Sequence, residues 1–130
     1  MAVRTLADVE AAVRASWSVE TCDDVDVPDW SLRNPSRGQC GATALVLQDL
    51  LGGDLLVAEV LHPDGSRQGF HAWNALSGGL QVDLTAEQFQ AGEVVQAPRV
   101  VERPPGPPRR CAAQYMLLRE RVFAALDHRS

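Results

Sequence analysis

The sequence predicts an α+β fold in which a buried central helix packs on a small antiparallel sheet, with a further helix near each end of the chain. The first observation is that residues 40–51 are apolar almost all round, with only Gln48 and Asp49 strongly polar, which is typical of a buried helix. The second is a series of strand-length runs separated by turn sequences, at residues 55–61, 70–76 and 80–84. The third is the helical spacing of apolar residues in the first and last segments.

Length and composition predict one domain, residues 1–130. Of the 130 residues, 45% are hydrophobic and 22% are charged, which suffices for a single core. The net charge of −5 argues against a surface that binds nucleic acid or anionic membranes. All 12 basic residues are arginine, which excludes Schiff-base chemistry, a pyridoxal anchor and a phosphate-loop lysine on this chain. We expect no cofactor, no nucleic-acid partner and no membrane partner.

Cysteine usage and the first residues favour a soluble, cytoplasmic protein. The three cysteines, Cys22, Cys40 and Cys111, are an odd number without close-spaced pairs, which fits reduced thiols better than a disulfide framework. Asp8 and Glu10 stand where a secretory signal would be apolar, and the longest apolar stretch is too short to span a bilayer.

Two segments precede the central helix. Residues 5–18 predict an amphipathic helix, in which Thr5 and Asp8 have capping-box spacing. Residues 20–29 form an acidic run. A calcium loop is disfavoured there because no glycine sits at the sharp turn and Pro35 stands where a bidentate glutamate would be. We therefore expect a solvated loop.

The register of the second and third strands decides which side chains can meet. If residues 77–79 form a three-residue hairpin loop, Trp73 lies opposite Asp83. His71 is then the diagonal neighbour of Asp83 on the same face of the sheet. A slip of one residue would place the two side chains on opposite faces.

Capping-box spacing occurs twice more, in Ser36 with Gln39 before the central helix and in Thr85 with Gln88 after the third strand. The second pair predicts a short helix. The chain then continues through an extended, proline-rich connection at residues 94–110 into a packing helix at about residues 110–128.

Cys40, His71 and Asp83 follow one another in an order that suits nucleophilic catalysis. Cys40 lies in or beside the first turn of the central helix, where unpaired N–H groups and the helix dipole favour a thiolate. A nucleophile needs a base and the base needs an orienting acceptor, roles that His71 and Asp83 can fill. The alternatives are a buried cysteine acting as a small hydrophobe, a core histidine, and an aspartate that caps the turn through Thr85. Asn74 is a rival acceptor, but strand alternation points it away from the face of His71.

These motifs resemble a known enzyme superfamily. Gly38-Gln39-Cys40 opening a helix, Gly69-Phe70-His71-Ala72-Trp73 on a strand and Val82-Asp83-Leu84-Thr85 on the next resemble the transglutaminase-like branch of the papain-like cysteine enzymes. More narrowly, the segments 34–40 and 48–53 and the His-x-Trp-Asn sequence resemble the small bacterial YunG-like proteins. The resemblance implies a papain-like or transglutaminase-like core and a Cys-His-Asp triad. Gly41 departs from it, because an aromatic residue often follows the nucleophile in transglutaminase-like proteins.

An oxyanion intermediate needs preorganised hydrogen-bond donors. The backbone N–H of Cys40 is the natural first donor. For the second we consider Gln39 and Asn34, the latter at a spacing from the cysteine that resembles the papain-like glutamine. Trp73 and Trp30 could form walls of the site and exclude water, although either could equally be a core residue.

The expected function is cysteine-dependent acyl transfer, as amide or peptide hydrolysis or as amidotransfer, on a peptide, amide or acyl substrate of unknown identity. One alternative is a papain-like binding or regulatory module without turnover. Another is a metal site that uses Cys40 and His71 with Cys22 or His62, although no close-spaced ligand pair favours it.

Overall fold

The structure is a computed structural model that describes residues 5–128. Its helices and strands are, in chain order, α1 (Leu6–Ser16), α2 (Cys40–Leu51), β1 (Asp54–Leu61), β2 (Arg67–Ala75), β3 (Gln81–Val82), β4 (Val94–Val95), β5 (Arg99–Val101) and α3 (Ala112–His128). Short 3₁₀ turns lie at Val19–Thr21, Asp24–Asp29, Ser77–Gly79 and Ala86–Gln88. The predicted α+β fold, with a central helix, an antiparallel sheet and flanking helices, is confirmed.

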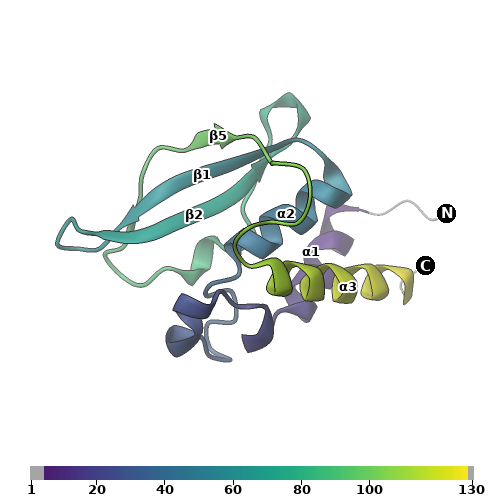
Figure 1. Cartoon of the computed structure of the whole chain (residues 1–130), viewed down its shortest axis with the longest axis horizontal. Coiled ribbons are helices and arrows are strands. Elements are labelled where there is room, and N and C mark those ends of the chain that lie inside the picture. Colours follow the sequence, from purple (N-terminus) through teal and green to yellow (C-terminus); the bar gives the residue numbers. More distant parts are fainter. Residues whose placement is uncertain (1–4, 129–130) are drawn as a thin grey trace.

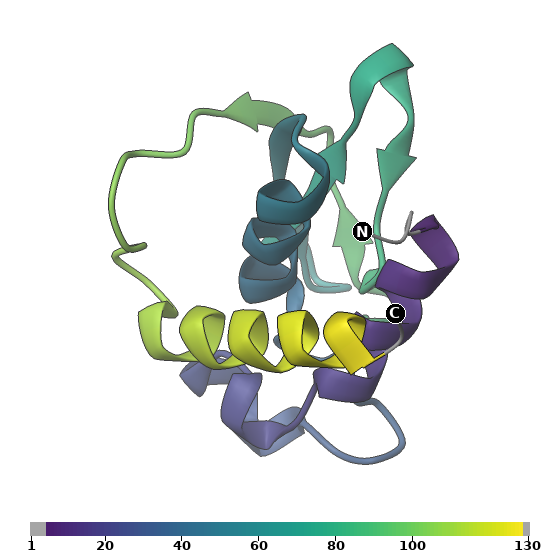
Figure 2. The ribbon, with the colours of Figure 1, turned by 90° about the vertical axis from the view of Figure 1, so that its right-hand side faces the viewer.

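The sheet forms one layer, and α2 packs between this sheet and α3. The strand order is β3-β2-β1-β4, β5 also pairs with β1, and all pairs are antiparallel. Figure 1 shows α2 lying under the β1–β2 hairpin, with α3 on its other side. Figure 2 shows α3 running across α1 and α2. The start of α2 is thereby held close to β2.

The main core forms where the three helices meet. Its most deeply buried side chains include Val13 of α1, Val46 and Leu47 of α2, and Leu118 and Val122 of α3, each at most 1% exposed. Burial of such side chains stabilises by about 1.5–3 kcal/mol each relative to exposure. The nearly all-apolar sequence of α2 is therefore explained, because the helix has the sheet on one side and two helices on the other.

The predicted capping box of the first helix is confirmed. The Thr5 hydroxyl accepts the Asp8 N–H at 3.1 Å, and the Asp8 carboxylate accepts the Thr5 N–H at 3.1 Å. The other two predicted capping boxes are wrong. Gln39 is itself the residue before α2 and makes no side-chain cap, and neither does Thr85 before the turn at Ala86–Gln88. The amides of Gln39 and Gln88 are used instead in long-range contacts described below.

The predicted register of β2 and β3 is confirmed. Asn74 pairs with Val82 and Ala75 with Gln81, which places Trp73 opposite Asp83. The ordered pairing is shorter than expected, because β3 has only two residues. The first half of β2 therefore has no β3 partner.

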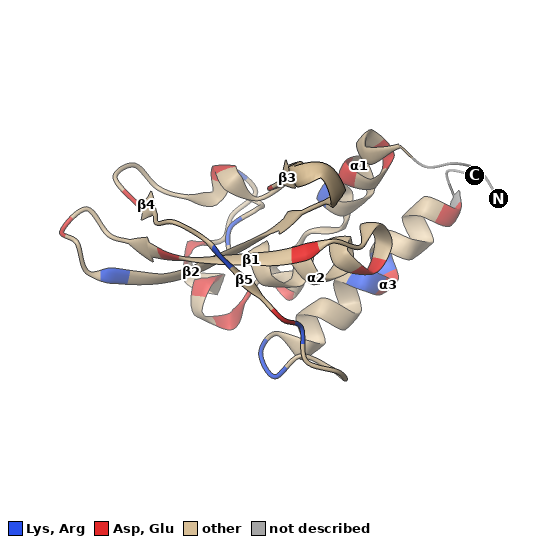
Figure 3. Ribbon diagram, turned by 90° about the horizontal axis from the view of Figure 1, so that it is seen from above, with Lys and Arg blue, Asp and Glu red and all other residues tan. Residues whose placement is uncertain are grey.

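The acidic run at residues 20–29 is largely exposed, as expected, but it is more ordered than a plain loop. It folds into two 3₁₀ turns whose carboxylates pair with arginines: Asp26 and Asp29 with Arg37 at 3.3 and 3.7 Å, and Asp23 with Arg110 at 3.0 Å. Arg37 is only 5% exposed and needs such partners, because an unpaired buried charge is costly. Figure 3 shows acidic and basic residues interspersed along the ribbon.

The proline-rich connection is extended, as predicted, but it also contributes two strands. Val95 pairs with Val60, and Val100 pairs with Leu56, both on β1. The prolines of the connection obscured these short edge strands, because proline cannot donate a ladder hydrogen bond. Within residues 5–128, no helix has both the length and the apolar character needed to cross a bilayer.

Candidate functional site

Cys40 is the first residue of α2, and Gly38 sets the path of the chain into it. Gly38 has φ +72°, a left-handed conformation that glycine adopts without strain. A Cβ at this position would lie 2.5 Å from the Cys22 Sγ and 2.7 Å from the Asp26 Cβ. The chain can therefore turn here only without a side chain. Cys40 is then placed where the N–H groups have no partner within the helix.

His71 and Asp83 meet across β2 and β3, in the diagonal arrangement that the register predicts. The His71 Nε2 lies 2.7 Å from the Asp83 Oδ2. The other oxygen, Oδ1, accepts the Thr85 N–H at 3.3 Å. The orienting role and the turn-capping role are thus compatible, because one carboxylate serves both. Asn74 points elsewhere, since its amide donates to the Ala44 carbonyl of α2 at 2.9 Å.

Aromatic rings enclose the imidazole of His71, which is 1% exposed. Trp73 stacks on it with ring centroids 5.1 Å apart, and Phe89 meets it edge-on at 4.8 Å. Nε2 is held by Asp83, so Nδ1 is the ring nitrogen left for other partners. The packing therefore fixes both the plane of the ring and the nitrogen that is available for chemistry.

Cys40 interacts with the same imidazole. Burial opposes the charge on His71, but the hydrogen bond with Asp83 and the interaction with Cys40 outweigh it and raise the pKa of His71 to about 9. The thiol makes only a long contact, 4.0 Å from Sγ to the Phe70 carbonyl oxygen. The thiol hydrogen can therefore turn toward the imidazole at small cost. The structure brings Cys40, His71 and Asp83 together, and their catalytic role stays a prediction.

The other two thiols are in a different electrostatic setting. Burial and nearby aspartates raise the pKa of Cys22 to about 12, and the same two causes raise the pKa of Cys111 to about 12. Asp23 acts on both, and Cys111 also donates a hydrogen bond to it at 3.3 Å. Both thiols should stay protonated, and therefore poor nucleophiles, across the neutral range.

A cavity of about 730 Å³ opens beside Cys40. Its lining includes Cys40, Gly41, Phe70, Gln88 and Cys111. A Cβ at Gly41 would meet nothing within 4 Å, so the absence of an aromatic residue there leaves free space next to the thiol. His71 does not line the cavity and lies behind the groups that do. Within the described residues, no group of three or more histidine, cysteine, aspartate or glutamate side chains could hold a metal ion.

Gln88 is a site residue that sequence reasoning missed. Its side chain is 4% exposed, its Oε1 accepts the Gly38 N–H at 3.0 Å, and its Nε2 lies 3.4 Å from the His71 Nδ1. The only sequence signal at this position was the capping-box spacing from Thr85, which indicated a local role. A polar side chain placed one residue before the aromatic Phe89, soon after the orienting aspartate, was the signal that could have found it.

The two residues suggested as second oxyanion donors point elsewhere. The amide of Gln39 donates to the Ser18 carbonyl at 2.9 Å and accepts the Thr21 hydroxyl at 2.7 Å, so it fastens the segment after α1. The amide of Asn34 donates to the backbone carbonyl of Gln88 at 2.9 Å. Neither residue lines the cavity. Their amides are engaged because buried polar groups must find partners, and the nearest ones are structural.

The two tryptophans also differ from each other. Trp73 supports the imidazole by stacking, and its indole donates to the Gln81 side chain at 2.9 Å. It therefore supports the imidazole of His71 and does not itself line the cavity. Trp30 donates to the Pro35 carbonyl at 3.0 Å and does not line the cavity, so the expectation that it walls the site is wrong.

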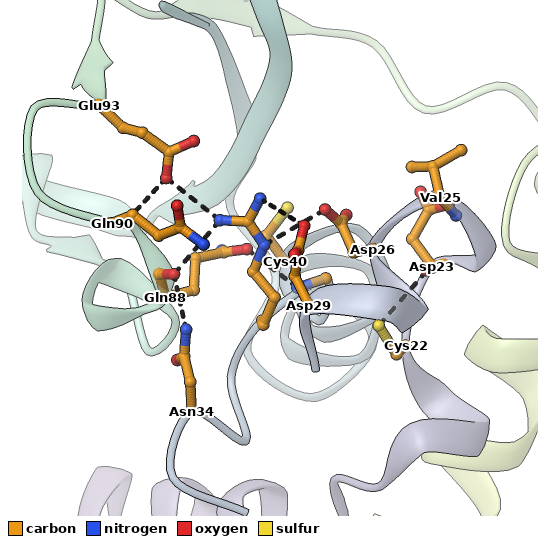
Figure 4. Close-up of polar contacts among 12 residues, drawn as sticks. Cys22, Asp23, Val25, Asp26, Asp29, Asn34, Cys40, Gln88, Gln90 and Glu93 are labelled. Carbon is orange, nitrogen blue, oxygen red and sulfur yellow. Dashed lines mark hydrogen bonds and ion pairs between the residues drawn. The ribbon is translucent and has the colours of Figure 1, made fainter. Parts of the chain in front are cut away.

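Arg37 holds the segments around the site together. Its guanidinium pairs with Glu93 at 3.1 Å and lies 3.5 Å from the backbone carbonyl of Gln88. The same guanidinium pairs with Asp26 and Asp29 on its other side. Figure 4 shows Glu93 and Gln88 on one side, and Asp26 and Asp29 on the other. One buried cation therefore ties the segment after β3 to the turn before α2.

Comparison with known proteins shows the family. The family described as "YunG protein" matches residues 5–127, which is nearly the whole chain. The chain belongs to the YunG family. A curated relative, "Uncharacterized protein YunG" of Bacillus subtilis (strain 168), is 36% identical over 83 residues. These residues span 64% of this chain and 62% of the relative, so the match covers less than two thirds of that protein. No solved structure matches the chain.

The YunG family assignment confirms the narrower of the two resemblances seen in the sequence. The match extends over the elements that carry Cys40, His71, Asp83 and Gln88. These matches do not extend to the broader likeness to papain-like and transglutaminase-like enzymes.

Proposed function

We propose that this YunG family member is a cysteine-dependent acyl-transfer enzyme with a papain-like or transglutaminase-like core, in which Cys40 is the nucleophile, His71 the base and Asp83 the group that orients it. The observation that carries the proposal is that Cys40 and Asp83 both interact with the buried imidazole of His71. Asp83 holds its Nε2 at 2.7 Å, and Cys40 at the start of a helix interacts with the same ring. Nucleophile, base and orienting acceptor in this relation are the pattern of nucleophilic enzymes.

The first step transfers a proton within the site. The His71 Nδ1 accepts the thiol proton of Cys40, and the Asp83 carboxylate stabilises the imidazolium through the Nε2–H hydrogen bond. The sulfur then attacks the carbonyl carbon of an amide or ester substrate in the cavity, which creates a tetrahedral oxyanion. The backbone N–H of Cys40, free of a partner within α2, supplies one donor to that oxyanion.

The second half of the reaction releases the products. The bond between the carbonyl carbon and the leaving group breaks, the proton on Nδ1 passes to the leaving amine, and a thioester remains on Cys40. Water or an amine then gives up a proton to Nδ1, attacks the thioester and frees the thiol. Hydrolysis results from water and amidotransfer from an amine. The pKa of His71, raised to about 9, suits the step in which the imidazole must carry a proton next to the sulfur.

Selective modification of Cys40 tests the proposal. Iodoacetamide at pH 6 should alkylate Cys40 while Cys22 and Cys111, whose pKa values burial and aspartates raise to about 12, stay free. Intact-mass analysis followed by peptide mapping measures the adduct. His71→Ala should raise the pH at which Cys40 reacts. Cys111→Ala is the matched control, because it removes a thiol that lines the same cavity and should leave the reaction unchanged.

The alternative, a binding or regulatory module without turnover, predicts a different result. In that case the three thiols would react at similar, slow rates, and His71→Ala would not change the pH dependence. One feature favours it, since the imidazole is 1% exposed and does not line the cavity beside Cys40. A screen of acyl and amide probes against wild type and Cys40→Ala separates the two functions directly.

A further inference from the structure

Gln88 has its side-chain amide in one defined orientation. Its Oε1 accepts the Gly38 N–H at 3.0 Å, and turning the amide over would place an NH₂ group against that N–H. The Nε2 therefore faces the His71 Nδ1, at 3.4 Å. The backbone carbonyl of Gln88 is also held, by Asn34 at 2.9 Å and Arg37 at 3.5 Å. These contacts, and a side chain that is 4% exposed, preorganise the amide.

Gln88 also reaches the place where the reaction is proposed to occur. It lines the cavity together with Cys40, whereas His71 behind it does not. An amide nitrogen carries two N–H groups, of which the His71 Nδ1 can accept only one. A fixed donor beside the nucleophile, with a hydrogen to spare, meets the geometric requirement for a second oxyanion donor.

We infer that Gln88 is the second oxyanion donor of this site, acting through its Nε2–H together with the backbone N–H of Cys40; the inference rests on the proposed acyl-transfer function. The papain-like resemblance suggested a side chain before the cysteine for this role, at Asn34 or Gln39. The amides of both are engaged away from the cavity. The donor comes instead from the segment that follows Asp83.

The protonation state of His71 couples Gln88 to the reaction. When His71 is neutral, its Nδ1 can accept a long hydrogen bond from the Gln88 Nε2, at 3.4 Å. When Nδ1 takes the proton of Cys40 it becomes a donor, and two donors then face each other. The Nε2–H is thereby free to donate in the imidazolium state, from which the sulfur attacks and negative charge develops on the substrate oxygen. Gln88 therefore contacts the reacting atoms only in the state that needs stabilisation.

Two chemically different probes separate this role from a structural one. Alkylation of Cys40 by iodoacetamide is a displacement that forms no oxyanion, whereas acylation by p-nitrophenyl acetate passes through a tetrahedral oxyanion. The nitrophenolate also leaves without a proton donor. The ratio of the two rate constants, measured by intact mass at one pH, thus reports on the oxyanion donors alone.

Gln88→Ala should lower the acylation rate by about 10²-fold, as removal of one oxyanion donor does in other enzymes, and should not slow alkylation. Gln88→Glu is the second variant, because its carboxylate can still accept the Gly38 N–H but cannot donate. It should lose acylation to the same extent, and it should raise the pKa of the His71 imidazole in an NMR titration. Gln90→Ala changes an exposed glutamine of the same segment and should leave both rates unchanged.

The outcomes that contradict the inference are distinct. If Gln88→Ala slows alkylation and acylation in parallel, or Gln88→Glu acylates at the wild-type rate, the role of Gln88 is structural and the proposed function stands. If wild type and Cys40→Ala consume p-nitrophenyl acetate at the same rate, the proposed function fails and the inference fails with it.

Discussion

The two ends of α2 carry two polar clusters of opposite character. At its start, Cys40 meets His71, whose pKa is raised to about 9, and Asp83 lies 2.7 Å from the imidazole Nε2. Near its end, Asp49 accepts hydrogen bonds from Arg103 at 2.7 Å and Arg119 at 3.2 Å. The hydroxyl of Tyr115 also donates to Asp49, and Arg103 donates to Tyr115 at 3.0 Å. The second cluster anchors α3 and the proline-rich connection to α2.

The difference between the clusters shows what marks a chemical site. Around Asp49 the charges are permanent, opposite in sign and partly exposed, so each pair contributes about 1 kcal/mol or less. Around Cys40 the imidazole of His71 is 1% exposed, and its interactions with Asp83 and Cys40 raise its pKa. A titratable, enclosed group beside a cavity is what separates a candidate active site from a structural clamp.

The largest expected effect is at Asp83. Asp83→Asn should lower the rate at which p-nitrophenyl acetate acylates Cys40 by about 10²–10⁴-fold, because an amide holds the imidazole in the wrong tautomer and cannot stabilise its cation. Stopped-flow release of nitrophenolate measures the rate. Asp49→Asn, the same change at the other end of α2, should leave it unchanged. Equal effects of the two variants would contradict the distinction between the clusters.

Two glycines near the start of α2 offer the next contrast. Gly38→Ala should reduce the free energy of unfolding by about 2–4 kcal/mol, because the left-handed backbone and the contact with the Cys22 Sγ leave no room for a Cβ. Gly41→Ala should increase stability by up to about 1 kcal/mol, because alanine favours the helix and its Cβ meets open space. Urea denaturation followed by circular dichroism measures both.

Because Gly41 lines the cavity, a larger side chain there can block substrates from the cavity without unfolding the protein. Gly41→Leu should fold normally yet slow acylation by bulky acyl esters more than acylation by the acetate. If Gly41→Leu lowers the acylation rate equally for all esters, or leaves every rate unchanged, substrates do not use this cavity.

The pH dependence of stability should distinguish the titrating cluster from the permanent one. The folded pKa of His71 is raised to about 9, above its ordinary 6.5, so the folded state binds more protons. The stabilisation is complete below pH 6.5 and is lost as pH rises through about 9. We expect a decrease of about 1 kcal/mol between pH 6.5 and 7.5, a range below the ordinary thiol pKa of about 8.5.

Cys40→Ala tests the origin of that decrease. Its fall in stability with pH should be shallower than that of wild type, because the interaction with Cys40 is one of the causes that raise the pKa of His71. Urea titrations at several pH values measure the slope. A slope that is the same in wild type and Cys40→Ala would mean that the thiol and the imidazole are not coupled.

The smallest expected effect lies at the far end of α2. Asp49→Asn should cost about 1 kcal/mol of unfolding free energy, because the Tyr115 hydroxyl and the arginines can still donate to the amide oxygen. The loss should shrink in 1 M salt, where exposed charge pairs are screened. A loss that is insensitive to salt would indicate packing rather than charge.

Local sequence patterns predicted the backbone of the site well. The apolar run of residues 40–51, the glycines around it and the alternation on the strands placed Cys40 at a helix start. The three-residue loop at residues 77–79 set the register that brings His71 to Asp83. These features depend on periods and turns a few residues long, so they can be read without knowledge of the rest of the chain.

Local patterns were misleading where a polar side chain had a choice of partners. Gln39 and Gln88 both have the spacing of a capping box, and in the folded protein neither caps. Gln88 instead bonds Gly38, a residue 50 positions earlier in the chain, and faces His71. Likewise, local patterns did not predict that Asp26 and Asp29 pair with Arg37, a buried cation outside the acidic run.

By itself, the sequence determined the central helix, the antiparallel hairpin and the order in which thiol, imidazole and carboxylate enter the site. The tertiary structure alone decided which amide lies beside the thiol and which amides are tied up elsewhere. The physical reason is that a buried polar side chain must be paired, and its partner is whatever donor or acceptor folding places within about 3 Å, however distant it is along the chain.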